Sequence, residues 1–235
     1  MKTEILISII IPAYNEEKLI GLCLSSLQNQ NFSKKDYEII VINNASTDNT
    51  AQIVQNFGVK LVNEPKKGVS FAIKRGFLEA KGKIIAITEA DTLVPPDWLS
   101  KIYMAFQNNP DVVLVGGRSV IKPDNHLTII ADIFLNYMGG KILRKSSACN
   151  LAIRRDIYFK IGGVYEKINF NYETELFLRA KKEGKTVFLW DNPVVTSSRH
   201  FEGIEGYKYC IRGATSSTIL LFIKKKIFTN MVDVR

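Results

Sequence analysis

The chain has 235 residues, of which 46% are hydrophobic and 23% are charged, and this balance indicates a globular protein and excludes a disordered one. The formal net charge of +9 favours an anionic partner such as a nucleotide, a phospholipid headgroup or a nucleic acid. No nucleic-acid-binding signature accompanies this charge and the basic residues are spread along the chain, so nucleic acid is the weakest of these partners. The length predicts one large domain, or a domain with an extension.

Three cysteines, Cys23, Cys149 and Cys210, lie far apart in the sequence. Their spacing matches no metal-binding pattern and they cannot all pair, which indicates a reducing compartment. The first residues combine a basic residue with an apolar run. However, Glu4 interrupts the run and no small-residue cleavage site follows, so a first strand is expected rather than a signal peptide. No apolar stretch has the length of a membrane-spanning helix, and a cytoplasmic protein is expected.

The first half of the chain alternates short apolar runs with segments of helical periodicity. Ile5 to Ile11 is almost uninterruptedly apolar, as in a strand that a parallel sheet buries on both faces. The alternation predicts a doubly wound α/β layer with a mostly parallel sheet and helices on both faces. Further strands are expected at Glu38 to Ile42, Val59 to Val62 and Lys83 to Thr88, and helices from Ile20 to Leu27, Thr50 to Phe57 and Val69 to Ala80.

The loops that follow these strands open on one edge of the sheet, where open α/β sheets bind ligands. Glu89 and Asp91 end an apolar strand with one residue between them, so they can converge on a hard cation or on hydroxyls. Alone, such a pair is more often a turn or a helix cap, and the convergence of the other loops favours a site. No glycine-rich dinucleotide or P-loop motif occurs. The edge is expected to gather Tyr14, Glu16, Asn43, Asn44, Asp48, Glu64, Lys67, Glu89 and Asp91.

The second half has a less regular pattern. Asp124 to Leu143 is helical in pattern with a wide apolar stripe, which predicts core packing, with a dimer or membrane surface as the alternative. The other expected elements are helices at Trp98 to Phe106 and Tyr172 to Lys182, and strands at Val112 to Val115, Arg118 to Ile121, Ser147 to Ile153 and Val187 to Trp190.

Gly203 to Arg235 is expected to form an amphipathic helix. Within it, Lys224 to Lys226 directly follows an apolar run. A basic cluster beside apolar residues fits an anionic bilayer surface. It fits equally well a helix that packs on the domain and leaves its lysines in water.

Five segments, in this order, resemble the family-2 glycosyltransferases of the GT-A fold. They are SIIIPAYNEEKLIGLCLSSL, INNASTDNT, KKGVSFAIKRGFLEAKGKIIAITEADTLVPPDWL, CNLAIRRDIYFKIGGVYE and YETELFLRAKKEGKTV. The resemblance extends from Ile5 to about Arg199, which is most of the chain. It implies a GT-A domain at residues 1–202, with a nucleotide-binding half at 1–108 and an acceptor-side half at 109–202. A helical extension at 203–235 would follow.

The resemblance implies inverting transfer of a sugar from a UDP- or GDP-linked donor to an acceptor hydroxyl. In the family, a divalent cation, Mg²⁺ or Mn²⁺, binds the donor diphosphate, and Asp91 matches its carboxylate ligand. Some relatives add a histidine from this C-terminal region, which makes His200 either a second ligand or a surface histidine. Glu173 matches the general base, with Glu175 in reserve. The residues that match the nucleotide site are Pro12, Ala13, Tyr14, Glu16, Asn43, Asn44, Arg75 and Glu89.

The sequence departs from the family at three places. Asn43-Asn44 and Glu89 stand where the family has aspartates, and Tyr172-Glu173 stands where it has a Glu-Asp pair. These departures motivate an alternative: a non-catalytic module that binds nucleotide sugars on a degenerate glycosyltransferase scaffold. If the chain is active, its acceptor is expected to be a lipid-linked or cell-surface glycan. The C-terminal helix would then make peripheral contact with the inner face of the membrane.

Overall fold

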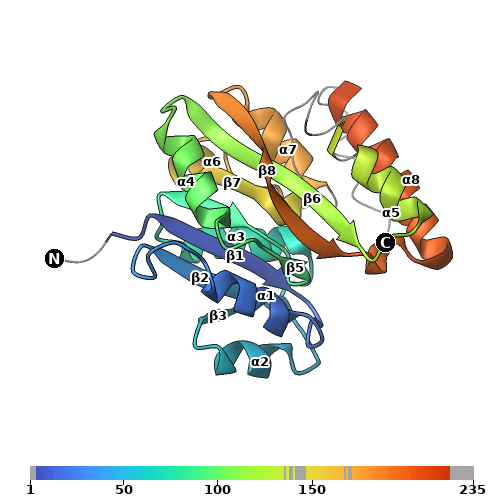
Figure 1. Cartoon of the computed structure of the whole chain (residues 1–235), viewed down its shortest axis with the longest axis horizontal. Coiled ribbons are helices and arrows are strands. Elements are labelled where there is room, and N and C mark those ends of the chain that lie inside the picture. Colours follow the sequence, from blue (N-terminus) through green and yellow to red (C-terminus); the bar gives the residue numbers. More distant parts are fainter. Residues whose placement is uncertain are drawn as a thin grey trace.

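The computed structural model describes residues 4–134, 136–137, 140, 147–166, 168 and 171–222. Its centre is one sheet with the strand order β3-β2-β1-β4-β7-β6-β8-β5 (Figure 1). Neighbouring strands within β3-β2-β1-β4 are parallel, and so are β6 and β8, whereas β7 and β5 run antiparallel to their neighbours. The strands are β1 Ile7–Ala13, β2 Tyr37–Asn43, β3 Lys60–Asn63, β4 Ile84–Ile87, β5 Thr92–Leu93, β6 Val112–Lys122, β7 Leu151–Arg154 and β8 Lys185–Ser197.

The central strand β1 is buried on both of its faces, which explains its run of isoleucines. Successive side chains of a strand point to opposite faces. Ile9 and Ile11 accordingly belong to one core cluster with residues of α1 and α4, and Ile10 belongs to a second cluster with residues of α3, α6 and α7. The predicted layer with helices on both faces is therefore confirmed. The helices are α1 Ile20–Gln28, α2 Thr50–Asn56, α3 Val69–Glu79, α4 Trp98–Gln107, α5 His126–Ile133, α6 Arg155–Lys160, α7 Tyr172–Ala180 and α8 Gly203–Phe222.

The strand β6 differs from the prediction of two short strands joined at Gly116-Gly117. It runs without interruption from Val112 to Lys122, with an irregularity in its pairing to β8 between Gly117 and Ser119. A Cβ atom on Gly117 would lie 2.3 Å from Nδ2 of the Asn150 side chain. The glycine is thus required by close packing inside a strand rather than by a turn.

The partner strand β8 also extends far beyond its predicted range. It continues to Ser197 and pairs with β6 on one side and with the short β5 on the other. The predicted strand at 147–153 begins instead with a 3₁₀ turn, Ala148–Asn150, and becomes β7 only at Leu151. These strands carry the sheet to the elements on the acceptor side of the predicted domain.

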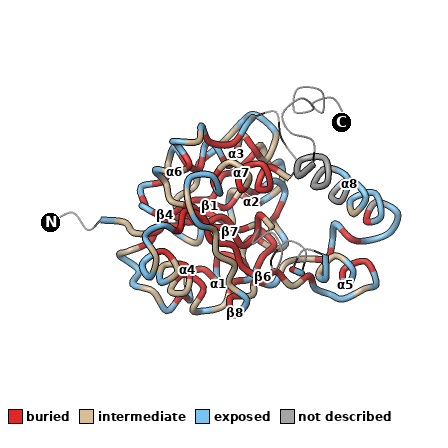
Figure 2. The backbone as a smooth tube through the Cα atoms, turned by 90° about the horizontal axis from the view of Figure 1, so that it is seen from above, coloured by how far each residue is buried: buried red, intermediate tan, exposed pale blue. Residues whose placement is uncertain are grey.

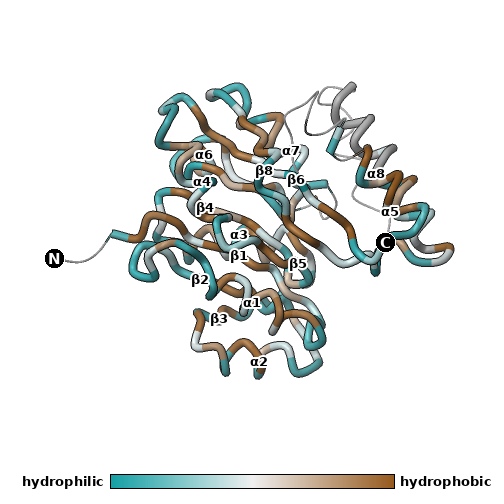
Figure 3. Tube along the Cα trace, in the orientation of Figure 1, coloured by the Kyte–Doolittle hydropathy of each residue, from teal (hydrophilic) through white to brown (hydrophobic). Residues whose placement is uncertain are grey.

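The helices α5 and α8 lie beside each other at one end of the molecule, away from most of the sheet (Figures 1 and 2). His126 Nε2 on α5 lies 2.7 Å from the Tyr207 hydroxyl on α8. The predicted core stripe of 124–143 holds only in part for α5: Leu127 is buried and Ala131 packs against its cluster, whereas Ile129, Ile130 and Ile133 are exposed. The hydropathy trace marks α5 and part of α8 as hydrophobic (Figure 3).

The extension predicted at 203–235 begins with α8, and the lysine cluster 224–226 lies outside the described residues. So do residues 135, 138–139 and 141–143 of the helix predicted at 124–143. Among the residues that the structure describes, none of the helices is both long enough and apolar enough to cross a membrane.

Two helical glycines provide a test of how tightly α3 packs on β1. A Cβ on Gly76 of α3 would lie 2.4 Å from Cγ2 of the buried Ile10, whereas a Cβ on Gly21 of α1 would meet its nearest atom at 3.8 Å. Both Gly→Ala changes gain about 1 kcal/mol of helix propensity. We expect Gly21→Ala to stabilise the protein and Gly76→Ala to destabilise it by about 1–3 kcal/mol through overpacking. Chemical denaturation measures both, and equal effects would contradict this packing.

Candidate active site

The loops that follow β1 and β2 are bonded to each other at the carboxyl edge of the sheet. Asn15, with a left-handed φ of 55°, accepts a hydrogen bond from the Thr47 amide at 2.8 Å through Oδ1. Its own amide donates to Ser46 Oγ at 3.0 Å. The next amide, that of Glu16, donates to Thr50 Oγ1 at 2.7 Å. The convergence predicted for these two loops is therefore present.

Asn44 connects the loop after β2 to the loop after β3. Its Nδ2 donates to the carbonyls of Glu64 at 3.2 Å and Lys66 at 2.6 Å, and its Oδ1 accepts from the Gly68 amide at 2.8 Å. A carboxylate could accept the last bond but could not donate the first two. The asparagine therefore fixes the path of this loop, and both of its N–H groups are used within the protein.

The other residues predicted for the nucleotide site lie around these loops. Asn43 donates through Nδ2 to Asn63 Oδ1 at 3.0 Å and accepts the Ser46 amide at 3.3 Å. Pro12 and Ala13 end β1. Tyr14 is 42% exposed, and the Lys67 ammonium lies 4.3 Å from the centre of its ring. An aromatic face and a cation thus border the loops.

Arg75 is not brought to this edge. Its guanidinium pairs with Glu79 one turn further along α3, at 2.8 Å. Glu79 in turn pairs with Lys60 at 2.8 Å, and Lys60 begins β3. The start of a strand lies at the edge opposite its carboxyl end. Arg75 therefore belongs to a structural ion-pair cluster toward that opposite edge of the sheet.

One guanidinium, that of Arg199, connects acids from two separate loops. It forms a bidentate pair with the buried carboxylate of Glu16, with Nη1 2.7 Å from Oε2. Its Nε lies 3.1 Å from Oδ2 of Asp91, and Thr196 Oγ1 donates to the other oxygen of Asp91 at 3.3 Å. The sequence patterns did not identify Arg199 as a site residue. The only signal in the sequence that could have identified it is its position after a strand, in a polar stretch.

Glu89 lies among these acids, and its position affects the pKa of its carboxyl. Burial, with a smaller contribution from the charges of Asp91 and Glu173, raises the pKa of the Glu89 carboxyl to about 8. Burial also raises the pKa of Glu16, and the bonds to Arg199 counteract this shift only in part. The edge is thus a cluster of acids that favours bound cations and bound protons.

The two candidate bases on α7 have different surroundings. Glu173 is buried at the first turn of the helix, and its charge contributes to the raised pKa of Glu89, so it belongs to the acid cluster. Glu175 is also buried but pairs with Arg179, which in turn donates to the carbonyls of Ile161 and Gly163. Glu175 therefore anchors the turn before α7, and Glu173 remains the candidate base.

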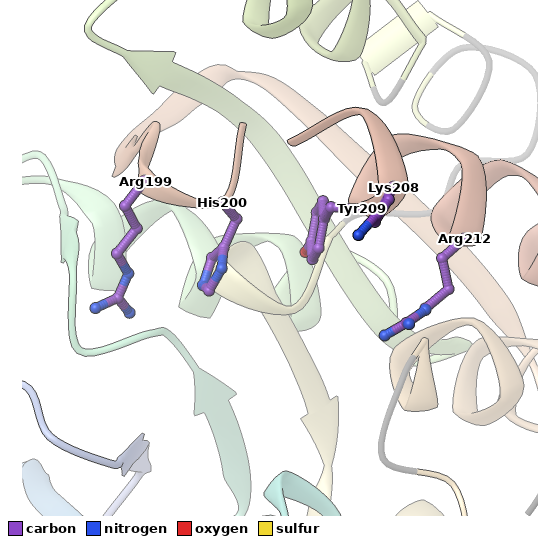
Figure 4. Close-up of a pocket in the computed structure, with 5 residues that line it drawn as sticks. All are labelled: Arg199, His200, Lys208, Tyr209 and Arg212. Atoms are coloured by element: carbon purple, nitrogen blue, oxygen red, sulfur yellow. The ribbon is translucent and has the colours of Figure 1, made fainter. Parts of the chain in front are cut away.

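His200 lies beside Arg199 in a cavity of about 200 Å³ (Figure 4). Burial lowers the pKa of His200, and the Arg199 charge lowers it further, so the imidazole is neutral at physiological pH. Its ring stacks on that of Tyr209, with centroids 5.3 Å apart and planes inclined by 14°. A neutral imidazole next to a carboxylate is chemically able to bind a metal ion.

The donor set fits a divalent cation that is shared with a substrate phosphate. Within the described part of the chain, no three histidine, cysteine or acidic side chains could hold a metal ion by themselves. Mg²⁺ sites in phosphate-binding proteins usually take one or two carboxylates and complete their ligands with phosphate oxygens and water. Asp91 supplies such a carboxylate, with His200 close by, and Arg199 occupies one Asp91 oxygen.

Arg199 is expected to stabilise the fold as well as the site. Arg199→Gln would leave the buried Glu16 without its partner, which we expect to lower the free energy of unfolding by about 2 kcal/mol or more. The control is Lys185→Gln, which removes an exposed pair with Asp111 at 3.4 Å and should change stability by under about 0.5 kcal/mol. Chemical denaturation compares them, and an Arg199 effect as small as that of the control would refute this role.

The raised pKa of Glu89 predicts that the free energy of unfolding depends on pH. The folded protein holds the Glu89 proton up to about pH 8, whereas the unfolded chain loses it near 4.5, so wild type loses stability as pH rises through this window. Glu89→Gln removes that loss. We expect the advantage of the variant in unfolding free energy to grow by about 2–4 kcal/mol between pH 5 and pH 8. Denaturant titrations at both pH values measure it, and a constant difference would contradict the raised pKa.

Comparison with curated proteins identifies a relative of known activity. Dolichol-phosphate mannosyltransferase of Pyrococcus furiosus is 34% identical over 119 residues, which cover 48% of this chain and 33% of that protein. The chain spans from a third to about half of the length of the curated relatives that it matches first.

Comparison with solved structures identifies proteins that share the architecture of this chain. TarS of S. aureus in complex with UDP-GlcNAc superposes with a TM-score of 0.69 at 18% identity, covering 86% of this chain and 61% of that one. The mannosyltransferase PcManGT of Pyrobaculum calidifontis, in complex with GDP-Man and Mn²⁺, superposes with a TM-score of 0.67 at 19% identity, covering 92% and 70%. These similarities show the fold, which is that of the GT-A glycosyltransferases.

The family follows from the sequence match. The model of glycosyl transferase family 2 matches residues 8–164, which is more than half of the chain. The matched range contains Asn43 at the end of β2 and the loops after β1 and β4 that carry Glu16 and Asp91. The chain belongs to glycosyl transferase family 2.

Proposed function

We propose that the protein transfers a sugar from a nucleoside-diphosphate donor to an acceptor hydroxyl, with inversion at the anomeric carbon. The observation that carries the proposal is the acid cluster of Glu16, Glu89, Asp91 and Glu173 at the carboxyl edge of the parallel strands, with Arg199 bound inside it. That edge is where open α/β sheets bind ligands, and the family supplies the reaction type.

The loops after β1 and β2 would hold the nucleotide. Tyr14 offers an exposed aromatic face, and Asn43 lies at the end of β2 with its amide turned into the loop. Because Asn44 uses both of its N–H groups to fix the neighbouring loop, we assign it the positioning of the site rather than contact with the base. The donor is a UDP- or GDP-sugar. The TarS complex with UDP-GlcNAc supports a UDP-sugar, and the PcManGT complex with GDP-Man supports a GDP-sugar equally well.

Asp91 would hold a divalent cation, Mg²⁺ or Mn²⁺, with His200 as the second protein ligand and the donor diphosphate completing the site. The cation would supply positive charge that stabilises the diphosphate as it leaves. The Mn²⁺ in the PcManGT complex supports this assignment. Arg199 must then share or release the Asp91 carboxylate, since its Nε is bonded there.

Glu173 would act as the general base. As the acceptor oxygen attacks the anomeric carbon, its proton passes to the Glu173 carboxylate, and the bond between that carbon and the diphosphate oxygen breaks. Attack on the face opposite the leaving diphosphate inverts the configuration. Glu173 is buried in the first turn of α7, and its charge acts on the Glu89 carboxyl, so it lies within the acid cluster.

We further propose that the protein works at a membrane surface on a lipid-linked or cell-surface glycan. Exposed isoleucines on α5 and α8 support this, as does the positive net charge. The dolichol-phosphate mannosyltransferase of P. furiosus, by its name, acts on a lipid phosphate. The contact would be peripheral, at the cytoplasmic face.

Donor hydrolysis tests the proposal directly. We expect the purified protein to hydrolyse one sugar of a panel of UDP- and GDP-sugars slowly with Mn²⁺ or Mg²⁺, and to lose this activity in EDTA. Asp91→Asn should abolish it, and Glu173→Gln should reduce transfer to an acceptor by about 10² to 10⁴-fold, the range of general-base catalysis. Asp111→Asn, at an exposed position just before β6, is the control and should stay active.

Two outcomes would overturn the proposal. Tight nucleotide binding with no turnover of any donor, and no effect of Glu173→Gln, would instead favour a non-catalytic nucleotide-sugar-binding module. No binding of any nucleotide in calorimetric titration would exclude this edge of the sheet as a nucleotide site.

A further inference from the structure

Two donors of different charge hold the carboxylate of Asp91. The neutral hydroxyl of Thr196, near the end of β8, donates to Oδ1 at 3.3 Å, and the Arg199 guanidinium lies with Nε 3.1 Å from Oδ2. At 3.3 Å the first bond is longer than most O–H···O bonds, as the hydrogen bonds of a catalytic site often are before a ligand binds. The Asp91 side chain is only 3% exposed, so protein groups rather than water determine its orientation.

The Thr196 hydroxyl has a fixed direction because a second threonine donates to it. Thr92 Oγ1, on the neighbouring strand β5, lies 3.1 Å from Thr196 Oγ1, and the two residues are cross-strand partners in the β5–β8 ladder. Thr92 is fully buried. A hydroxyl has one proton, so a Thr196 oxygen that accepts from Thr92 keeps its own proton for Asp91. The pairing of the two strands therefore sets a chain of hydrogen bonds that ends on the Asp91 carboxylate.

A cation on Asp91 would affect the two donors differently. The Arg199 guanidinium is positively charged and a divalent cation repels it, so Arg199 must share or release its carboxylate oxygen. The Thr196 hydroxyl is neutral and donates to the other oxygen, so its bond is compatible with a cation on the carboxylate. Thr196 is therefore the donor that can keep Asp91 in place while the cation is bound.

The bond from Thr196 connects a loop residue to a strand. Asp91 lies between β4 and the short β5, whereas Thr196 lies on β8, which pairs with β6 over most of its length. A strand holds a hydrogen-bonding group more precisely than a loop does. Groups that hydrogen-bond to a metal ligand orient it, and their removal typically weakens metal binding by roughly 10- to 100-fold. The position of Thr196 is that of such a group.

We propose that Thr196 is a positioning residue for the cation site. Through its bond to Oδ1 it holds the Asp91 carboxylate in the orientation that binds Mg²⁺ or Mn²⁺, and Thr92 supports it by fixing the direction of its hydroxyl. The inference rests on the proposed function in one respect, namely that Asp91 binds the cation of the donor complex. It adds to the site a residue that lies outside the range matched by the family model.

The test is calorimetric titration of Mn²⁺ into the full chain at one fixed concentration of UDP or GDP, so that Mn²⁺ binding by free nucleotide is the same in every titration. We expect Thr196→Val, which keeps the shape of the side chain but removes the hydroxyl, to raise the Mn²⁺ dissociation constant by about tenfold or more. Thr196→Ser keeps the hydroxyl and should remain within about threefold of wild type. The control is Thr186→Val, the same change near the start of β8 and opposite Leu114 of β6, which should alter the dissociation constant less than about twofold.

Two results would overturn the role of Thr196 alone. The first is an unchanged Mn²⁺ dissociation constant in Thr196→Val that circular dichroism shows to be folded. The second is an equal loss of Mn²⁺ binding in Thr196→Val and Thr196→Ser, which would assign the effect to packing rather than to the hydroxyl. A wild-type chain that binds no Mn²⁺ at all would contradict the cation site of the proposed function, and the role of Thr196 with it. The behaviour of wild type therefore separates the two failures.

Discussion

The bonds of the Arg199 guanidinium to Glu16 and Asp91 determine the arrangement of the candidate site. Glu16 follows β1, Asp91 follows β4, and Arg199 follows β8, so one cation joins three parts of the chain. Without it, the carboxylates of Glu16 and Asp91 would repel each other in a partly buried space, where charge interactions are stronger than in water. The same residue begins the 3₁₀ turn Arg199–Phe201 that precedes α8, and it lines the cavity beside His200, which is basic because Lys208 and Arg212 also line it. The acidic donor side and the basic cavity are therefore neighbours because they share Arg199.

The sheet places these groups through its topology. β1 lies between β2 and β4, all parallel, so the loops after the three strands leave the sheet at the same edge. Hydrogen bonds donated by the Glu16 amide and accepted by the side chains of Asn15 and Asn44 then join the loops into one surface. The antiparallel β7 and the long β8 extend the sheet, and β8 returns the chain to Asp91 through Thr196. The candidate site is thus built from both halves of the sequence.

Local patterns predict the first half of the fold well and the second half poorly. The isoleucine run from Ile5 to Ile11 is a signal carried by adjacent residues, and β1 follows it closely. β8 passes through Asp191, Asn192 and Pro193, which carry no strand pattern, and is held by its pairing with β6. The partner of Arg199 is 183 residues away, and no periodicity encodes such a contact. The family resemblance located the acids, but the bonds that determine their protonation, and the exclusion of Arg75 from the site, required the structure.

The central claim is that the loops after β1, β2 and β4 form one nucleotide site. Hydrogen–deuterium exchange of the full chain, with and without a bound nucleoside diphosphate and Mn²⁺, tests it most directly. We expect slower exchange of backbone amides in residues 13–17, 43–49 and 88–92 together, with no change in the loop of Lys34 and Lys35 at the opposite edge. Nucleotide binding that slows exchange elsewhere and leaves these three loops unchanged would contradict it.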